Sequence, residues 1–123
     1  MNPTDDRVDL LRLHPCSRGL PEEALQEIAE AAELIRCRPG ECIHRANDPV
    51  TSVYLIIHGR VRTRVVDTTG TVIMQRFQIA GDQFGGLAAA LAEPVPMECF
   101  AEDPSTLLRF DYSSGLELTK KYD

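Results

Sequence analysis

Residues 52–79 read SVYLIIHGRVRTRVVDTTGTVIMQRFQI and carry the clearest strand pattern in the chain. The stretch 52–58 is almost continuously apolar, which predicts a buried strand. Over 60–67 apolar and polar residues alternate, so the two kinds of side chain lie on opposite faces of a second strand. Residues 68–70, Thr-Thr-Gly, predict a turn, and 71–79 predict the strand that returns from it. The segment therefore predicts consecutive antiparallel strands.

Shorter strand patterns and helical patterns surround this segment. Strands are predicted over 34–37, 41–45, 97–101 and 106–110. Helices are predicted over 5–13, from the Leu20-Pro21-Glu22-Glu23 start onward, over 87–92, and over 115–122 with Ser113 or Ser114 as its cap. Many short strands separated by turn residues favour a barrel or sandwich over a parallel sheet. We therefore expect an α+β fold, a jelly-roll-like antiparallel β-roll of about eight strands with helices at both ends.

The composition is that of a small globular chain with an acidic balance. Its 123 residues fit one domain, and a hydrophobic share of 43% is enough for a core. The net charge of −6 and the isoelectric point near 5.0 argue against a nucleic-acid-binding segment, because such modules carry a basic patch. The apolar runs are too short to span a bilayer, and the acidic N-terminus is not a secretory signal. We expect a cytoplasmic protein whose segment contacts neither nucleic acid nor membrane.

No group of residues has the spacing of a metal site or an active site. The cysteines, Cys16, Cys37, Cys42 and Cys99, include no CxxC pair. Cys42 and His44 are expected to share a strand face, but two ligands do not close a site. The sequence contains no Walker loop, no HExxH and no G-x-S-x-G motif. We therefore expect no enzymatic activity, no metal and no cofactor.

Three arginines lie on one face of the strand predicted over 60–67. Arg60, Arg62 and Arg64 are called the arginine row below. One interpretation is a solvated outer face paired with nearby acids, which is an ordinary arrangement in antiparallel sheets. The other is a binding site for an anion or a partner. If this face borders the interior of the roll, the row would supply positive charge to a pocket there. The outer-face interpretation is the one we expect.

Four motifs occur in a consistent order along almost the whole chain. They are Leu20-Pro21-Glu22-Glu23, Pro39-Gly40-Glu41-Cys42-Ile43, the strand 53–61 with its Tyr54-Leu55-Ile56 and Gly59, and Gly81-Asp82-Gln83-Phe84-Gly85. Together they resemble the cyclic-nucleotide-binding domain family, which is shared by catabolite-activator-type transcription factors, kinase regulatory subunits and gated ion channels. The resemblance implies a regulatory sensor domain in signal transduction.

The resemblance also implies an organisation and a set of partners. The expected parts are an N-terminal helical segment over 1–19, the β-roll over 20–112, and over 113–123 the start of a C-terminal helix leading to a missing module. In the family, ligand binding shifts the terminal helix and passes the signal on. The implied partners are an unidentified small-molecule effector, a downstream module or partner protein, and a second copy in a homodimer.

The family holds the phosphate of its ligand in a cassette at the N-terminus of a short helix, where free backbone N–H groups favour an anion. The resemblance places the backbone frame of that cassette at Phe84, Gly85, Gly86, Leu87 and Ala88. Ala88 matches the position whose amide meets the phosphate. This part of the frame is therefore expected to survive.

Four positions depart from the family pattern. A glutamate that holds the ribose hydroxyl is replaced by Gly86, and the arginine that pairs with the phosphate is replaced by Val95. Pro96 follows and has no N–H to donate. Glu98 stands where a small hydroxyl residue is common, and a carboxylate there would repel a phosphate. The cassette is therefore expected to be degenerate.

These losses are large enough to decide binding. Losing the partner of a buried charge costs roughly 2–5 kcal/mol, and a lost ribose contact adds about 1–3 kcal/mol. A micromolar site would weaken to about millimolar or worse, since about 1.4 kcal/mol is tenfold. We expect that cAMP and cGMP do not bind usefully. Three possibilities stay open: a sensor for a different ligand, a ligand-free interaction or dimerisation domain, and the sensor half of a transcription regulator whose DNA-binding part is absent.

Overall fold

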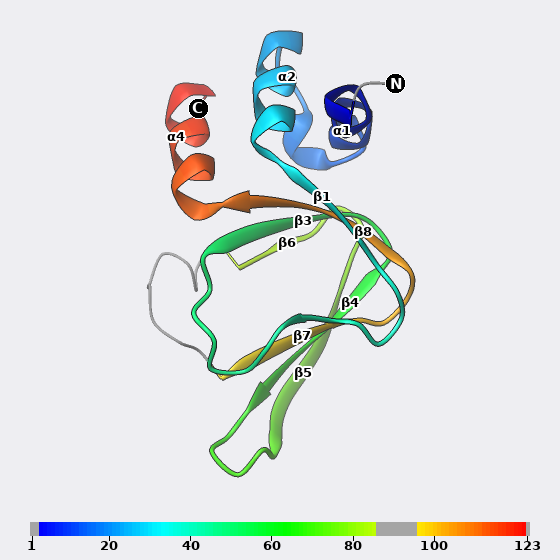
Figure 1. Cartoon of the computed structure of the whole chain (residues 1–123), viewed down its shortest axis with the longest axis vertical. Helices are drawn as coiled ribbons and strands as arrows, with labels where there is room; N and C mark the ends of the chain where they lie inside the picture. The colour runs from blue at the N-terminus through cyan, green and yellow to red at the C-terminus, as the bar shows by residue number, and fades with distance from the viewer. Residues whose placement is uncertain (1–2, 86–95, 123) are drawn as a thin grey trace.

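The computed structural model describes residues 3–85 and 96–122. Within them, two four-stranded antiparallel sheets form a roll, and the helices gather beyond one of the sheets (Figure 1). Sheet A has the strand order β1-β8-β3-β6, and sheet B has the order β2-β7-β4-β5. The predicted α+β fold, an antiparallel β-roll of about eight strands with helices at both ends, is confirmed.

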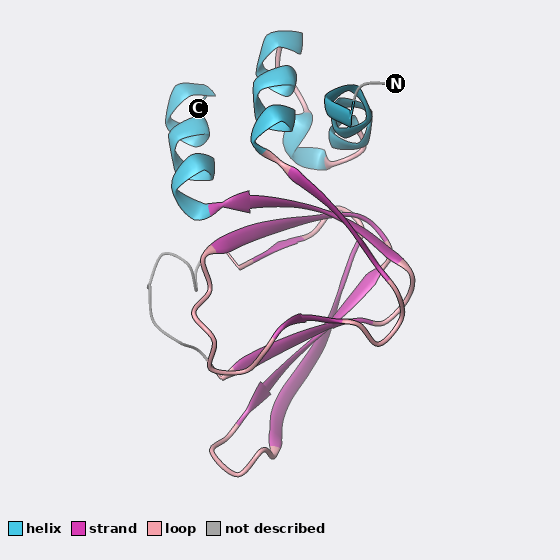
Figure 2. Ribbon diagram, viewed as in Figure 1, coloured by secondary structure: helices cyan, strands magenta, loops and turns pink. Residues whose placement is uncertain are grey.

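The elements have the following bounds. Sheet A consists of β1 (Glu33–Cys37), β3 (Ser52–His58), β6 (Gln83–Phe84) and β8 (Ser105–Asp111). Sheet B consists of β2 (Cys42–His44), β4 (Arg60–Val66), β5 (Val72–Ile79) and β7 (Met97–Ala101). The helices are α1 (Pro3–Arg12), the 3-10 turn η1 (Pro15–Ser17), α2 (Glu22–Ala31) and α4 (Tyr112–Tyr122), and Figure 2 shows them on the side of sheet A away from sheet B. None of the helices described is long and apolar enough to cross a membrane.

Sheet A separates two hydrophobic clusters. The first lies between sheet A and the helices and contains Val8, Leu11, Leu25, Ala29, Ala32, Leu55, Ile57, Leu108 and Phe110. The second lies between the two sheets and contains Cys37, Ile56, Val61, Phe84, Cys99, Ala101 and Leu107. Leu107 and Leu108 are adjacent and both fully buried, because successive side chains of β8 enter opposite clusters. This double burial explains why the central strands of sheet A are apolar without alternation.

Sheet B is covered on its inner face only. Its edge strand β5 exposes five large apolar side chains, Val72, Ile73, Met74, Phe77 and Ile79. Gln78 is the buried residue of this strand, and it faces the interior of the roll opposite Val61. An edge strand has unpaired backbone groups as well as exposed side chains. Strand β5 is therefore the least protected part of the sheets.

The structure differs from the sequence pattern at three places. Helix α4 begins at Tyr112, so Ser113 and Ser114 lie inside its first turn and do not cap it. Pro21 is the N-cap of α2, with a φ of −68° and a ψ of 160°, and the helix proper begins one residue later. Residues 83–84 form the strand β6, which is too short to produce a periodic sequence pattern. The helix predicted over 87–92 lies outside the described residues.

The prediction that Cys42 and His44 share a strand face is wrong. Cys42 is paired in register with Phe100, whereas His44 is paired with Cys99, so the register shifts by one residue between them. A β-bulge of this kind adds a residue to one strand and breaks the alternation of side chains. In the part of the chain that is described, no three His, Cys, Asp or Glu side chains come together as a metal site would require.

Candidate functional site

The start of the predicted cassette lies against β3 of sheet A. Phe84 pairs with Tyr54, and their rings stack with centroids 4.8 Å apart and planes 11° apart. Gly85 has a φ of +96°, and a Cβ there would lie 2.5 Å from the carbonyl oxygen of Ser52. Only glycine combines a left-handed backbone with such a close approach. The path of the chain as it leaves sheet A therefore requires the glycine of this motif.

The remaining cassette positions are described only in part. Gly86, Leu87, Ala88 and Val95 lie outside the described residues, so their roles stay predictions. Pro96 is exposed, and its carbonyl oxygen accepts a hydrogen bond of 2.8 Å from the N–H of Val66. This contact fixes the beginning of β7 against β4. Its pyrrolidine nitrogen has no proton to offer an anion.

Glu98 lies on the outer face of sheet B. The buried Cys99 and Ala101 of β7 face sheet A, and Glu98 alternates with them. The Glu98 carboxylate accepts a hydrogen bond from the guanidinium of Arg64, which is its register partner on β4. The structure thus places Glu98 away from the space between the sheets, whereas the sequence reasoning expects it beside a phosphate.

Every member of the arginine row is paired with an acid on the outer face of sheet B. The partners of Arg60, Arg62 and Arg64 are, in order, Asp103, Glu102 and Glu98. The Arg60–Asp103 and Arg62–Glu102 pairs have N···O distances of 3.4 and 3.5 Å. The row also lies over aromatic rings, with guanidinium carbons 4.9 Å from the Phe77 centroid and 5.6 and 5.0 Å from that of Phe100. The outer-face interpretation is confirmed, and the row supplies no charge to the interior.

A small polar group lies on the inner face of sheet B. The hydroxyl of Thr63 donates a hydrogen bond of 2.8 Å to the side-chain oxygen of Gln78, and it lies 3.7 Å from the sulfur of Cys99. All three residues are buried. Burial raises the pKa of the Cys99 thiol to about 11, although the hydrogen bond to Thr63 opposes the shift. The interior wall of sheet B is therefore polar but uncharged at this point.

Sheet A contributes a charged side chain that the sequence reasoning missed. Arg109 of β8 donates from Nε to the hydroxyl of Ser52 over 2.9 Å, and from Nη1 to the carboxylate of Glu33 over 2.9 Å. Arg109 is paired in register with Tyr54, whose ring packs against the cluster between the sheets. Burial raises the pKa of Tyr54, and the Arg109 charge acts against this shift. Arg109 therefore lies on the inner face of sheet A, next to the strand that receives Phe84.

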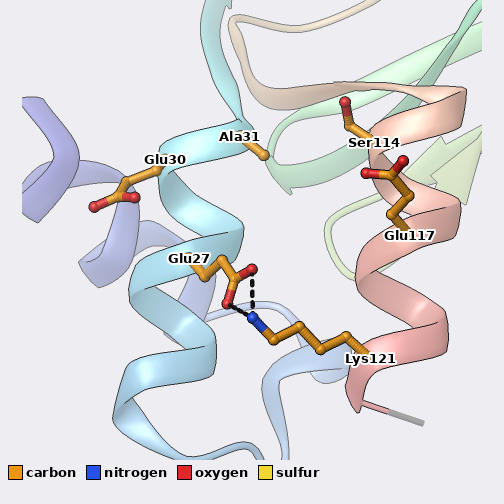
Figure 3. A pocket seen from close by; sticks show the side chains of 6 residues that line it. All are labelled: Glu27, Glu30, Ala31, Ser114, Glu117 and Lys121. Carbon is orange, nitrogen blue, oxygen red and sulfur yellow. Dashed lines mark hydrogen bonds and ion pairs between the residues drawn. The ribbon is translucent and has the colours of Figure 1, made fainter.

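A hollow lies between α2 and α4, outside the roll. Figure 3 shows the side chains that line it, and they are Glu27, Glu30, Ala31, Ser114, Glu117 and Lys121. Its volume is about 410 Å³. Lys121 reaches across from α4 and places Nζ 3.0 and 2.9 Å from the two carboxylate oxygens of Glu27 (Figure 3). This groove is acidic and open, and its ion pair ties the terminal helix to α2.

Solved structures share this fold along nearly the whole chain. A cAMP-binding acyltransferase from Mycobacterium smegmatis has a TM-score of 0.82 and 22% identity, over 94% of this chain and 36% of that one. The sensor domain of the transcriptional regulator DNR from Pseudomonas aeruginosa has a TM-score of 0.81 and 21% identity, over 99% and 82%. The regulatory subunit of a cAMP-independent protein kinase A from Trypanosoma brucei has a TM-score of 0.78 and 17% identity, over 97% and 46%. This chain thus spans less than half of the first and third proteins.

The sequence itself also matches a known family. A search of the curated proteins finds no match. The family model described as cyclic nucleotide-binding domain matches residues 34–122, which include all eight strands of the roll but for the first residue of β1. The matched range therefore includes the motifs around Gly59 and Phe84-Gly85 as well as both sheets. The chain belongs to the cyclic nucleotide-binding domain family.

Proposed function

We propose that this chain is a non-enzymatic regulatory sensor domain whose cassette does not hold cAMP or cGMP in the usual way. The observation that carries the proposal is the orientation of the arginine row. The phosphate-pairing arginine position is Val95, and the three arginines of β4 are all held outside the roll by acids. No cation of that strand therefore replaces the missing one.

The proposed ligand site keeps the cassette positions expected from the sequence. Phe84 and Gly85 form its wall at β3, Gly86, Leu87 and Ala88 would supply backbone N–H groups, and Val95 and Pro96 would close it without charge. Glu98 takes no part, because Arg64 holds its carboxylate on the outer face. A pocket of this composition favours an effector that does not depend on a cassette arginine. The cAMP-independent kinase subunit offers a precedent for the same fold without that effector.

The proposed output runs through α4. This helix follows β8 directly, and its contact with α2 includes the Glu27–Lys121 ion pair. Movement of the cassette against sheet A would be passed along β3 and β8 to the start of α4, because β8 pairs with β3 over most of its length. A downstream module or partner protein in the cytoplasm would then receive the signal.

Isothermal titration of the chain with cAMP and with cGMP tests the proposal. We expect no binding tighter than about millimolar for the natural sequence. A triple variant, Gly86→Glu with Val95→Arg and Pro96→Ala, restores the ribose carboxylate, the phosphate cation and a backbone N–H. We expect this variant to bind at least about a hundredfold tighter, since a regained charge pair and hydrogen bonds are worth roughly 3 kcal/mol or more. Low-micromolar binding by the natural sequence would refute the proposal.

A second candidate function, a ligand-free dimerisation domain, is favoured by the exposed apolar face of β5. Ile73, Phe77 and Ile79 are 66%, 46% and 57% exposed on an edge strand. Such a patch marks an interaction surface more often than an isolated exposed residue does. Sedimentation equilibrium would detect a dimer, and the double variant Phe77→Ser with Ile79→Ser would dissociate it. A monomer at all concentrations of the natural chain would exclude this candidate.

A further inference from the structure

The inner face of sheet A carries one arginine at the end of the sheet where the cassette begins. Arg109 is paired in register with Tyr54, and Tyr54 is paired with Phe84 on its other side. Residues directly opposite one another in antiparallel strands share a face. Since the cluster between the sheets includes Phe84 and packs against Tyr54, the Arg109 side chain lies on the inward face.

Two contacts fix the guanidinium of Arg109 near the cassette. Nε donates to the hydroxyl of Ser52, which is buried, over 2.9 Å. The backbone of the same serine adjoins Gly85, because a Cβ on that glycine would lie 2.5 Å from the Ser52 oxygen. A single buried residue thus touches both the arginine and the glycine with which the chain leaves sheet A. Ser52 alone therefore separates the Arg109 guanidinium from Gly85, where the cassette begins.

The second contact is a carboxylate that can leave. Glu33 accepts from Nη1 over 2.9 Å, and its side chain is 62% exposed, against 35% for Arg109. Exposed ion pairs of this kind contribute little to stability, so the carboxylate is easily exchanged. Within the described residues Nη2 of Arg109 makes no further hydrogen bond. A guanidinium presents its N–H groups as a planar fork that matches carboxylate and phosphate groups.

We propose that Arg109, positioned by Ser52 and beside Tyr54, is the anion-binding point of this domain, and that it takes the carboxylate or phosphate group of a small ligand in exchange for Glu33. The inference rests on the proposed function, since it names the charge that a ligand would use in a roll whose β4 arginines face outward. Glu33 occupies the anion position in the free protein. Ligand binding therefore competes with an ion pair between β1 and β8.

Nuclear magnetic resonance of the arginine Nε–Hε groups of the natural chain tests this inference. The chain is titrated with inorganic phosphate and, separately, with acetate, with sodium chloride keeping the ionic strength constant. We expect a saturable shift of the Arg109 Nε–Hε signal with at least one of the two anions. A shift with phosphate alone indicates a phosphate-bearing ligand, a shift with acetate alone indicates a carboxylate, and a shift with both indicates a site open to either. The absence of a saturable shift with both anions would overturn the inference.

Variants of the two paired residues give opposite results if the inference is correct. Glu33→Gln removes the competing carboxylate and is expected to tighten anion binding about two- to fivefold, as for an exposed ion pair. Arg109→Gln is expected to abolish it, and Arg109→Lys to weaken it because the fork is lost. Arg36→Gln is the matched control. Arg36 is an exposed cation of β1, the strand that carries Glu33, and it lies on the face of β1 opposite to Glu33. Equal losses in Arg36→Gln and Arg109→Gln would mean that the anions respond only to net charge, which contradicts the inference.

The outcome is separable from that of the proposed function. Low-micromolar cAMP binding by the natural chain would refute the proposed function without touching the anion titration. An unchanged affinity in Glu33→Gln would refute the inference even if cAMP does not bind. Because Glu33 is exposed, its replacement leaves the fold intact, so the test does not depend on whether Arg109→Gln folds.

Discussion

The two sheets of the roll have the same number of strands but differ in how many of their faces are buried. Sheet A is packed between the helices and sheet B, so both of its faces are buried, whereas sheet B has one buried face and one face in water. The difference decides where charges go. The arginines of β4 face outward, where acids pair with them. Strand β8 has the helices on one side and the interior of the roll on the other, and the Arg109 side chain lies on the interior side, where it contacts Ser52. The burial of each sheet thus decides whether its arginines face water or the interior of the roll.

Replacing a fully buried residue of the cluster between the sheets should cause the largest loss of stability. Leu107→Ala removes a fully buried side chain from the cluster between the sheets. We expect the free energy of unfolding to fall by about 2–5 kcal/mol, because lost transfer energy adds to the cost of a cavity. Urea unfolding measures it. The matched control, Ile73→Ala on the uncovered edge strand β5, is 66% exposed and should change stability by less than about 0.5 kcal/mol. Similar losses in the two variants would mean that the β5 face is covered in solution.

The junction between the sheets should be the next most sensitive point. Gly59 connects β3 of sheet A with β4 of sheet B at a φ of +104°, and a Cβ there would lie 2.3 Å from the Ser105 hydroxyl oxygen and 2.6 Å from its Cα. We expect Gly59→Ala to cost roughly 3 kcal/mol, combining backbone strain with a steric clash. Thermal or urea unfolding measures the loss.

Gly70 provides the comparison, because it has a similar φ of +86° in the β4–β5 turn, but a Cβ added there would have no atom within 4 Å. Gly70→Ala should therefore cost only the backbone strain of about 1 kcal/mol. If the two variants lost equal stability, close packing at the sheet junction would not be the reason for Gly59.

The sequence predicts the fold because the burial of each sheet is visible in the pattern of apolar residues along its strands. Alternation over 60–67 and the continuous apolar run over 52–58 report one-sided and two-sided burial, and each strand forms where its pattern predicts it. Local signals fail where a tertiary contact decides: the bulge between Cys42 and His44 depends on register with β7, and β6 is a two-residue strand.

The candidate site was predictable in part for the same reason. Phe84 and Gly85 belong to a local motif that sequence alone reveals, and the structure places them together against β3. Arg109 lies in the run Thr106 to Phe110, where burial on both faces removes the alternation that would tell inward from outward. Its direction follows only from the register with Tyr54. Sequence reasoning therefore identified Phe84 and Gly85 but not Arg109.

A pH titration should distinguish the inner face of sheet B from the outer one. The folded-state pKa of Cys99 is about 11, above its ordinary value of 9.0, because the thiol is buried. The unfolded chain therefore loses this proton at lower pH than the folded chain. The stabilisation is fully present below about pH 9 and is lost as the pH rises toward 11, by on the order of 2 kcal/mol.

Cys99→Ala should flatten this decline in the free energy of unfolding, measured by urea unfolding from pH 8 to about 11. Part of the decline should remain, because burial also raises the pKa values of Tyr54 and Cys37. Cys42→Ala is the control on the outer side, since Cys42 is exposed and pairs in register with Phe100. It should remove only a minor part of the decline, because Cys42 contributes to the raised pKa of Cys99 less than burial does. A decline that Cys42→Ala flattens as strongly as Cys99→Ala would contradict the assignment of the two faces.

The smallest expected effect lies within the outer face of sheet B itself. The Arg64–Glu98 pair has side chains 27% and 20% exposed, whereas those of Arg60–Asp103 are 43% and 49% exposed. Double-mutant cycles with Gln and Asn replacements should give a coupling energy of up to about 1 kcal/mol for the first pair and roughly 0.3 kcal/mol for the second, because water and salt screen the more exposed charges. Raising the salt concentration should weaken the second coupling proportionally more. Equal couplings would mean that Arg64 holds the Glu98 carboxylate no more firmly than Arg60 holds that of Asp103, which would contradict the role given to Arg64 in keeping Glu98 away from the ligand site.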